Sequence, residues 1–124
     1  MKPSKIGSSF VSGTEVQTVT QETFDQLVLN GTGPIAVEFM SYSCEHCRAM
    51  EPVLEKVAEM VKSKGTIFKV NIAVDPELGD RCGVRATPTF VMFLNGNIVG
   101  RSEGPSPTVS SIMTAVAQPF RATP

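Results

Sequence analysis

Four consecutive residues, Cys44-Glu45-His46-Cys47, hold two thiols at a spacing that suits reversible oxidation. Residues three apart on a helix lie on one face with Cβ atoms about 5–6 Å apart, so a small adjustment brings their sulfurs to disulfide geometry. A cysteine at a helix start also faces unpaired backbone N–H groups and the positive end of the helix dipole, which favour its thiolate. We therefore expect Cys44 to be the attacking nucleophile and Cys47 the resolving thiol. The alternative is that they are two small buried residues that share a helix.

The patterns on either side of this motif predict where it lies. Residues 34–40 are almost continuously apolar, as expected of a central parallel strand that is covered on both faces. From Cys44 to about Lys62, apolar residues recur every three or four positions, which indicates an amphipathic helix that is kinked at Pro52. The motif is thus predicted at the junction of the central strand and the long helix.

The remaining patterns alternate between strand and helix. In chain order they predict a strand at 15–19, a helix from 20–22 to 30–31, a strand at 66–72, a short helix or turn at 76–82, a hairpin of 89–94 and 97–100, and a helix at 106–117. Asn95-Gly96 supplies the positive φ angles of a tight hairpin turn. This order predicts an α/β fold with a central mixed β-sheet and helices on both faces.

Length and charge restrict the classes of function. The 124 residues, of which 41% are hydrophobic, suit one compact domain, which we place at residues 16–120, between a flexible lead-in at 1–15 and a tail at 121–124. Eleven basic and twelve acidic residues give a net charge of −1, which provides no footprint for nucleic acid or an anionic membrane. No apolar run approaches the roughly 20 residues that cross a bilayer. The function must therefore depend on a local site.

The cysteine count indicates the compartment. Three cysteines, two of them in one motif, differ from the even, dispersed spacing of a secreted disulfide framework. The first 13 residues lack the continuous apolar stretch of a secretory signal. We therefore expect a soluble, cytoplasmic monomer. Cys82 is expected to be a small buried residue, the alternative being a regulatory thiol near a docking face.

Together, the motif and its surroundings resemble the thioredoxin family from about Val16 to Phe120. Glu38 stands six residues before the first motif cysteine, where the family has a buried acid, and Pro52 stands five residues after the second, where the family has a kinking proline. The other positions that match the family are Lys69, beside the buried acid; Ala86-Thr87-Pro88-Thr89-Phe90, the cis-proline segment; Asn95-Gly96, the hairpin turn; and Gly104. The resemblance implies the thioredoxin fold.

The resemblance also implies roles for these residues. Burial in an apolar strand should raise the pKa of Glu38 toward the range in which it accepts a proton from Cys47, unless Glu38 faces solvent from an edge strand. Lys69 is expected to pair with Glu38 and temper that shift, the alternative being a lysine that faces solvent. Pro88, with a cis peptide bond, would set a loop whose backbone receives an extended substrate, rather than being an ordinary loop proline. With Pro88, we expect the substrate-binding residues to be Ser43, Thr87 and Gly104.

The motif itself departs from the family pattern. The family reads Trp-Cys-Gly-Pro-Cys, whereas this chain reads Ser43-Cys44-Glu45-His46-Cys47 and has no tryptophan. His46 is expected to stabilise the Cys44 thiolate by hydrogen bonding or charge, with Glu45 opposing it, which would make the centre more oxidising. The alternative is that His46 is an exposed residue of the first helical turn.

These features predict a thiol–disulfide oxidoreductase that reduces disulfide-containing protein substrates by dithiol–disulfide exchange. It would need no cofactor, and a separate thioredoxin reductase would recharge it. An oxidant or isomerase would use the same chemistry. The sequence also leaves open a zinc site, in which Cys82 joins Cys44, His46 and Cys47, and a non-catalytic adaptor of the same fold.

Overall fold

A five-stranded mixed sheet forms the centre of the computed structural model, which describes residues 15–121. The strands lie in the order β1-β3-β2-β4-β5. Strands β1 and β2 run parallel to β3, whereas β4 runs antiparallel to both β2 and β5. In chain order the strands are β1 (Gln17–Thr18), β2 (Pro34–Met40), β3 (Thr66–Asn71), β4 (Thr89–Leu94) and β5 (Asn97–Glu103).

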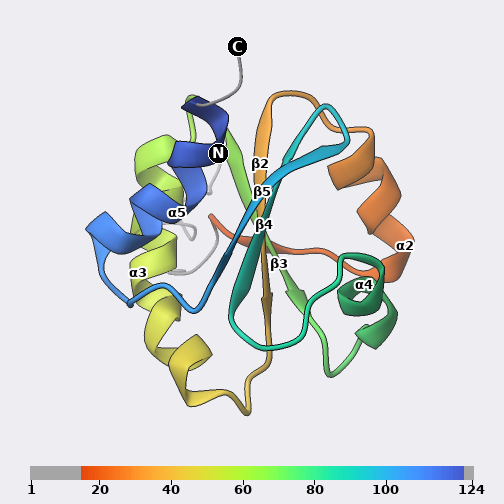
Figure 1. The fold of residues 1–124 in the computed structure, drawn as a ribbon, viewed down its shortest axis with the longest axis horizontal. Helices are drawn as coiled ribbons and strands as arrows, with labels where there is room; N and C mark the ends of the chain where they lie inside the picture. The colour runs from red at the N-terminus through yellow and green to blue at the C-terminus, as the bar shows by residue number, and fades with distance from the viewer. Residues whose placement is uncertain (1–14, 122–124) are drawn as a thin grey trace, which may run out of the picture.

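Helices cover both faces of this sheet, as Figure 1 shows. Helices α3 and α5 lie together on one face, and α2 and α4 lie on the other (Figure 1). Their bounds are α2 (Gln21–Phe24), α3 (Glu45–Val61), α4 (Pro76–Arg81) and α5 (Val109–Arg121), and a π-helical turn, η1 (Asp25–Leu29), continues α2. The predicted fold class is confirmed, with the long helix directly after the central strand.

Strand β2 separates two apolar cores, because successive side chains of a strand point to opposite faces. Val37 and Phe39 belong to the core beneath α2 and α4, whereas Ala36 belongs to the core beneath α3 and α5. Every residue from Ile35 to Met40 is buried, so the prediction of a strand covered on both faces is confirmed.

Several predicted boundaries were wrong. Helix α5 begins at Val109 rather than at 106, because the Thr108 hydroxyl accepts a hydrogen bond from the Ser111 amide (3.2 Å) in its first turn. The helix then continues through Pro119, beyond the predicted end at 117. The predicted strands at 15–19, 66–72 and 97–100 are instead 17–18, 66–71 and 97–103.

The predicted lead-in and tail lie largely outside the described residues. Of the lead-in, the structure describes only Glu15, whose amide donates to the Glu55 carboxylate at 2.9 Å. Of the tail, it describes only Arg121, the last residue of α5. Within residues 15–121, no helix is both long and apolar enough to cross a membrane.

The turn that joins β4 to β5 contains Gly96, which has a positive φ, and Gly33, which also has a positive φ but precedes β2, provides a control. Gly96 (φ 85°) lies against η1, where a Cβ would be 2.6 Å from the Leu29 carbonyl oxygen, whereas a Cβ at Gly33 (φ 76°) meets nothing within 4 Å. Alanine in the left-handed region costs about 1–2 kcal/mol at either site. We predict that Gly96→Ala lowers the free energy of unfolding in urea by more than Gly33→Ala. Equal losses would mean that the turn moves away from Leu29 without cost.

Candidate active site

The two motif cysteines lie in different environments at the start of α3. Cys44 is the N-cap residue, with extended backbone angles, and its sulfur accepts a hydrogen bond from the Cys47 amide at 3.2 Å. Cys44 is partly exposed, whereas Cys47 is completely buried. Both are free thiols. A ligand or substrate that approaches the helix start can therefore reach the Cys44 sulfur first.

These environments separate the acidities of the two thiols. Burial acts to raise the pKa of Cys44, but hydrogen bonds with the side chains of Cys47 and Thr87 and with the backbone amides of Cys47 and His46 outweigh it and lower the pKa below its usual value. Burial, followed by the hydrogen bond with Cys44, raises the pKa of Cys47 to about 11. The arrangement can thus hold one sulfur as a thiolate beside a second that keeps its proton.

The segment around Pro88 lies against the Cys44 sulfur. The Thr87–Pro88 peptide bond is cis, as predicted, and the Cys44 thiol donates to the Thr87 carbonyl at 3.6 Å. The Pro88 carbonyl accepts a hydrogen bond from the Gly104 amide at 2.9 Å. Ser43, directly before Cys44, is exposed. The structure therefore brings together the four residues that were predicted to bind substrate.

Glu38 lies beneath this site and is 1% exposed. Its Oε2 atom has no hydrogen-bond partner among the described residues. Burial, and then the negative charge of Glu51, raises the pKa of Glu38 to about 8, while the charge of Lys69 acts to lower it. The prediction that Glu38 is buried is confirmed, and the edge-strand alternative is wrong.

The ion pair of Lys69 corrects one prediction. Lys69 lies opposite Glu38 in the register of β2 and β3, but its Nζ atom pairs with Glu51 Oε2 at 2.9 Å rather than with the predicted partner. Lys69 is 8% exposed, so the alternative of a solvent-facing lysine is also wrong. Glu51 was not among the predicted site residues. The available signal was its spacing, because Glu51 follows Cys47 by four residues and so shares its helix face.

The imidazole of His46 is exposed and makes a hydrogen bond with Pro105, whereas stabilisation of the Cys44 thiolate by its charge stays a prediction. Its Nε2 atom lies 2.9 Å from the Pro105 carbonyl oxygen and must donate, because a carbonyl can only accept. The described hydrogen bonds of the Cys44 sulfur instead involve Cys47 and Thr87. His46 favours the thiolate through its backbone amide, while its ring holds the turn after β5.

The zinc ligands of the alternative hypothesis are not assembled. No three His, Cys, Asp or Glu side chains within residues 15–121 are grouped closely enough to hold a metal ion. Cys82 lies in the core beneath α2 and α4, is 6% exposed, and has a pKa raised by burial. The prediction that Cys82 is a small buried residue is confirmed.

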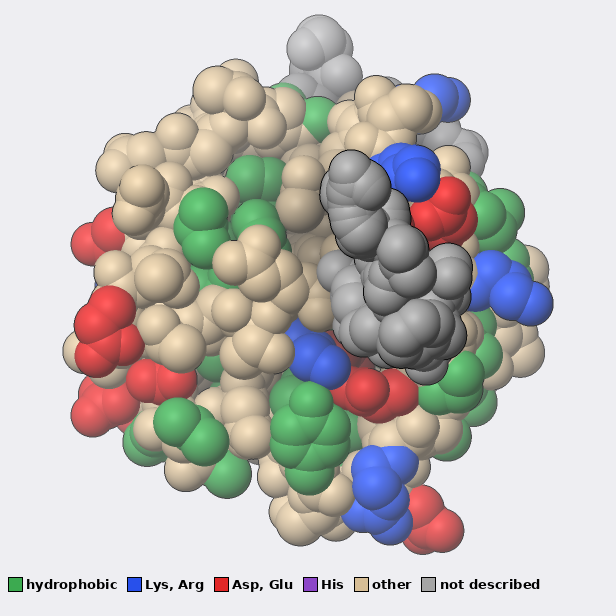
Figure 2. All heavy atoms as spheres, turned by 180° about the vertical axis from the view of Figure 1, so that it is seen from behind, with side chains coloured by type: hydrophobic (Ala, Val, Ile, Leu, Met, Phe, Trp, Pro, Cys, Tyr) green, Lys and Arg blue, Asp and Glu red, His purple; other side chains and the backbone are tan. Residues whose placement is uncertain are grey.

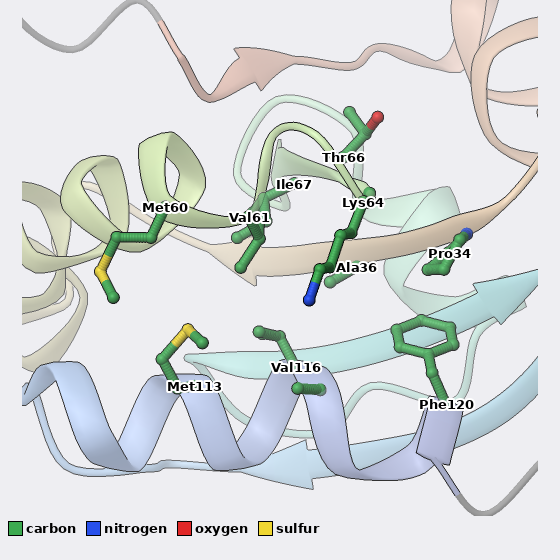
Figure 3. A pocket seen from close by; sticks show the side chains of 12 residues that line it. Pro34, Ala36, Met60, Val61, Lys64, Thr66, Ile67, Met113, Val116 and Phe120 are labelled. Carbon is green, nitrogen blue, oxygen red and sulfur yellow. The ribbon is translucent and has the colours of Figure 1, made fainter.

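An apolar cavity of about 380 Å³ lies away from the cysteines (Figure 3). Its lining includes Pro34 and Ala36 near the beginning of β2, whereas Cys44 follows the end of that strand. Met60 and Val61 of α3 face Met113, Val116 and Phe120 of α5 across it (Figure 3). The lining of the cavity includes none of the residues that surround the thiols, so the cavity is separate from the candidate active site.

Charged side chains are mixed on the face seen in Figure 2, where basic and acidic groups lie scattered among polar and apolar ones. This distribution agrees with the net charge of −1. It gives no basic surface on that face for a nucleic acid to follow.

Comparisons with known proteins agree with this geometry. The family profile described as Thioredoxin matches residues 15–118. The chain is 35% identical over 78 residues to a thioredoxin of Rickettsia bellii, covering 63% of this chain and 74% of that protein. It is 32% identical over 96 residues to thioredoxin 1 of a Nostoc species, covering 77% and 90%. A solved structure of Malassezia sympodialis thioredoxin superposes with a TM-score of 0.73 at 28% identity, over 83% of this chain and 89% of the other.

The raised pKa of Glu38 predicts a pH dependence of stability. The carboxyl has its ordinary pKa of 4.5 in the unfolded chain and a pKa of about 8 in the folded one, so folding favours its protonated form. The stability that Glu38 contributes is therefore present below pH 4.5 and is lost as the pH rises through about 8.

Urea unfolding of the reduced protein at a series of pH values tests this dependence against the variant Glu38→Gln. Between pH 4.5 and 8, the free energy of unfolding of the natural protein should fall relative to the variant by several kcal/mol, since each unit of pKa shift is worth about 1.4 kcal/mol. A constant difference across this range would show that Glu38 titrates at its ordinary pKa.

Proposed function

The chain belongs to the thioredoxin family and is a thiol–disulfide oxidoreductase, and we propose that Cys44 and Cys47 are its redox pair. The observation that carries this proposal is the hydrogen bond from the Cys47 amide to the Cys44 sulfur at the start of α3. It favours the thiolate of the more exposed cysteine and leaves the buried one as a thiol.

In the first step, the Cys44 thiolate attacks one sulfur of a disulfide in the substrate protein. The substrate S–S bond breaks, a mixed disulfide forms between Cys44 and the attacked sulfur, and the other substrate sulfur leaves as a thiolate that takes a proton from solvent. The partly exposed position of Cys44 at the helix start supports its role as nucleophile.

In the second step, the Glu38 carboxylate accepts the proton of Cys47, and the Cys47 thiolate attacks the Cys44 sulfur. The mixed disulfide breaks, the substrate leaves with two reduced sulfurs, and a Cys44–Cys47 disulfide remains. A base is needed here because the pKa of Cys47 is about 11. The pKa of Glu38, about 8, suits a group that exchanges protons near neutral pH.

We propose that the substrate docks along the segment that contains Ser43, Thr87, Pro88 and Gly104. The Thr87 carbonyl is 3.6 Å from the Cys44 sulfur, so an extended peptide that paired with this backbone would bring its disulfide to the nucleophile. His46 supports the same surface, because its ring holds Pro105, the neighbour of Gly104.

The family implies disulfide-containing proteins as substrates and a reductase as the source of electrons. We propose that a separate thioredoxin reductase returns the Cys44–Cys47 disulfide to the dithiol. We further propose that the chain acts in the cytoplasm as a monomer, with residues 16–120 as its single domain. The absence of a dispersed disulfide framework supports a reducing compartment.

The roles of the two cysteines predict which variant traps a substrate. With insulin as the disulfide substrate, Cys47→Ser should accumulate a mixed disulfide on Cys44, because the resolving thiol is gone. Cys44→Ser should form none, and Cys82→Ser should reduce insulin like the natural protein. Non-reducing electrophoresis and mass spectrometry measure the products. A mixed disulfide on Cys47 in the Cys44→Ser variant would reverse the assignment of the two roles.

A further inference from the structure

The ion pair of Lys69 and Glu51 lies between β3 and α3 and is largely shielded from solvent. The side chains are 10% and 32% exposed, and the two charged atoms are 2.9 Å apart. By contrast, Glu59 near the end of α3 and Lys62, the residue directly after that helix, form a pair of the same length with side chains 56% and 58% exposed. Shielding makes a charge interaction stronger, so the Lys69–Glu51 pair acts on its neighbours more than the exposed pair does.

Lys69 pairs with Glu51 although Glu38 is its neighbour in the sheet. The register of two parallel strands places Lys69 directly beside Glu38, whose Oε2 atom has no hydrogen-bond partner among residues 15–121. The ammonium group nevertheless contacts Glu51, and it lies 5.5 Å from the centre of the Tyr42 ring. Two attractions thus hold the ammonium group on the side of α3 and the loop before it.

We propose that Glu51 is a positioning residue of the redox centre, which holds the Lys69 ammonium group in an ion pair and so leaves the buried Glu38 carboxyl able to hold and release the proton of Cys47. The inference rests on the proposed function, because it assumes that Glu38 is the proton acceptor. It adds a residue of α3 that is not a partner in the hydrogen bonds described for the Cys44 sulfur within residues 15–121 and that acts through Lys69.

The charges that act on Glu38 come from two neighbouring elements. Glu51 and Cys44, from α3 and its N-cap, raise the pKa of Glu38, and Lys69, from β3, lowers it. Removal of the Glu51 charge would therefore lower the pKa of Glu38 in two ways. It would remove a negative charge that disfavours the carboxylate, and it would free a positive charge that favours it.

The consequence concerns the resolving step. A carboxyl that titrates near pH 8 is a base strong enough to take a proton from Cys47, whereas one that titrates lower is a weaker base. If Glu51 is replaced by a neutral residue, the resolving step should begin to accelerate at lower pH and reach a lower maximum rate. The initial attack by Cys44 should keep its rate, because Glu51 is not a partner in the described hydrogen bonds of the Cys44 sulfur.

The test is the titration of the Glu38 carboxyl carbon by NMR in the reduced protein, with its resonance assigned by its loss in Glu38→Gln. In Glu51→Gln the midpoint should fall by about one pH unit. Glu51→Asp, which keeps the charge, should restore it toward the natural value. The matched control is Glu59→Gln, which removes the same charge from the exposed pair on the same helix and should leave the midpoint unchanged. An unchanged midpoint in Glu51→Gln would overturn the proposal.

A second variant separates the route through Lys69 from the direct effect of the Glu51 charge. Lys69→Met should raise the Glu38 midpoint, and Glu51→Gln should shift it less in that background, because no ammonium group remains to be freed. Equal shifts in both backgrounds would overturn the role of Lys69.

Quenched-flow measurement of the resolving step distinguishes failure of this inference from failure of the proposed function. If Glu38→Gln leaves the resolving rate and its pH profile unchanged, Glu38 is not the proton acceptor, whatever the titrations give. If Glu38→Gln slows that step but Glu51→Gln keeps the natural pH profile, the proposed function stands and the role of Glu51 is wrong.

Discussion

The N-cap residue of helix α3 is Cys44, so a sulfur atom caps the first turn of this helix. An oxygen-bearing side chain usually accepts the unpaired amide hydrogens of a first turn, but here the Cys44 sulfur accepts from the Cys47 amide at 3.2 Å. The amides that need an acceptor therefore stabilise a thiolate, and the same turn places Cys47 in the interior three residues later. One local constraint thus produces an accessible nucleophile and a protected thiol, and the surrounding structure supports this difference.

The sheet provides what the buried thiol needs in order to react. Because β2 is covered on both faces, the carboxyl of Glu38 is removed from water, which makes it a base near neutral pH instead of a permanent anion. The positive charge of Lys69 would weaken this effect if Glu51 did not compensate it. The ion pair with Glu51 makes the pKa of Glu38, on β2, depend on charges that lie on β3 and α3. The pKa of the proton acceptor therefore depends on how α3 packs on the sheet.

The sequence predicts those features that depend on local pattern. The apolar run around Glu38 correctly indicated its burial, and the strand–helix junction at Cys44 correctly indicated which thiol lies at the helix start. It could not predict where long polar side chains end, because this depends on segments far along the chain. His46 bonds a carbonyl 59 residues away, and Lys69 bonds a carboxylate 18 residues away. Helix α5 ends late for a different reason, since a proline in its last turns does not stop it.

The central claim is that the helix start makes Cys44 the reactive thiol while burial protects the other two cysteines. Its most direct test is brief alkylation of the reduced, folded protein with iodoacetamide at neutral pH, followed by mass-spectrometric mapping of the modified residue. The account predicts rapid modification at Cys44, with Cys47 and Cys82 modified only after unfolding. Modification of Cys47 as fast as that of Cys44 would contradict it.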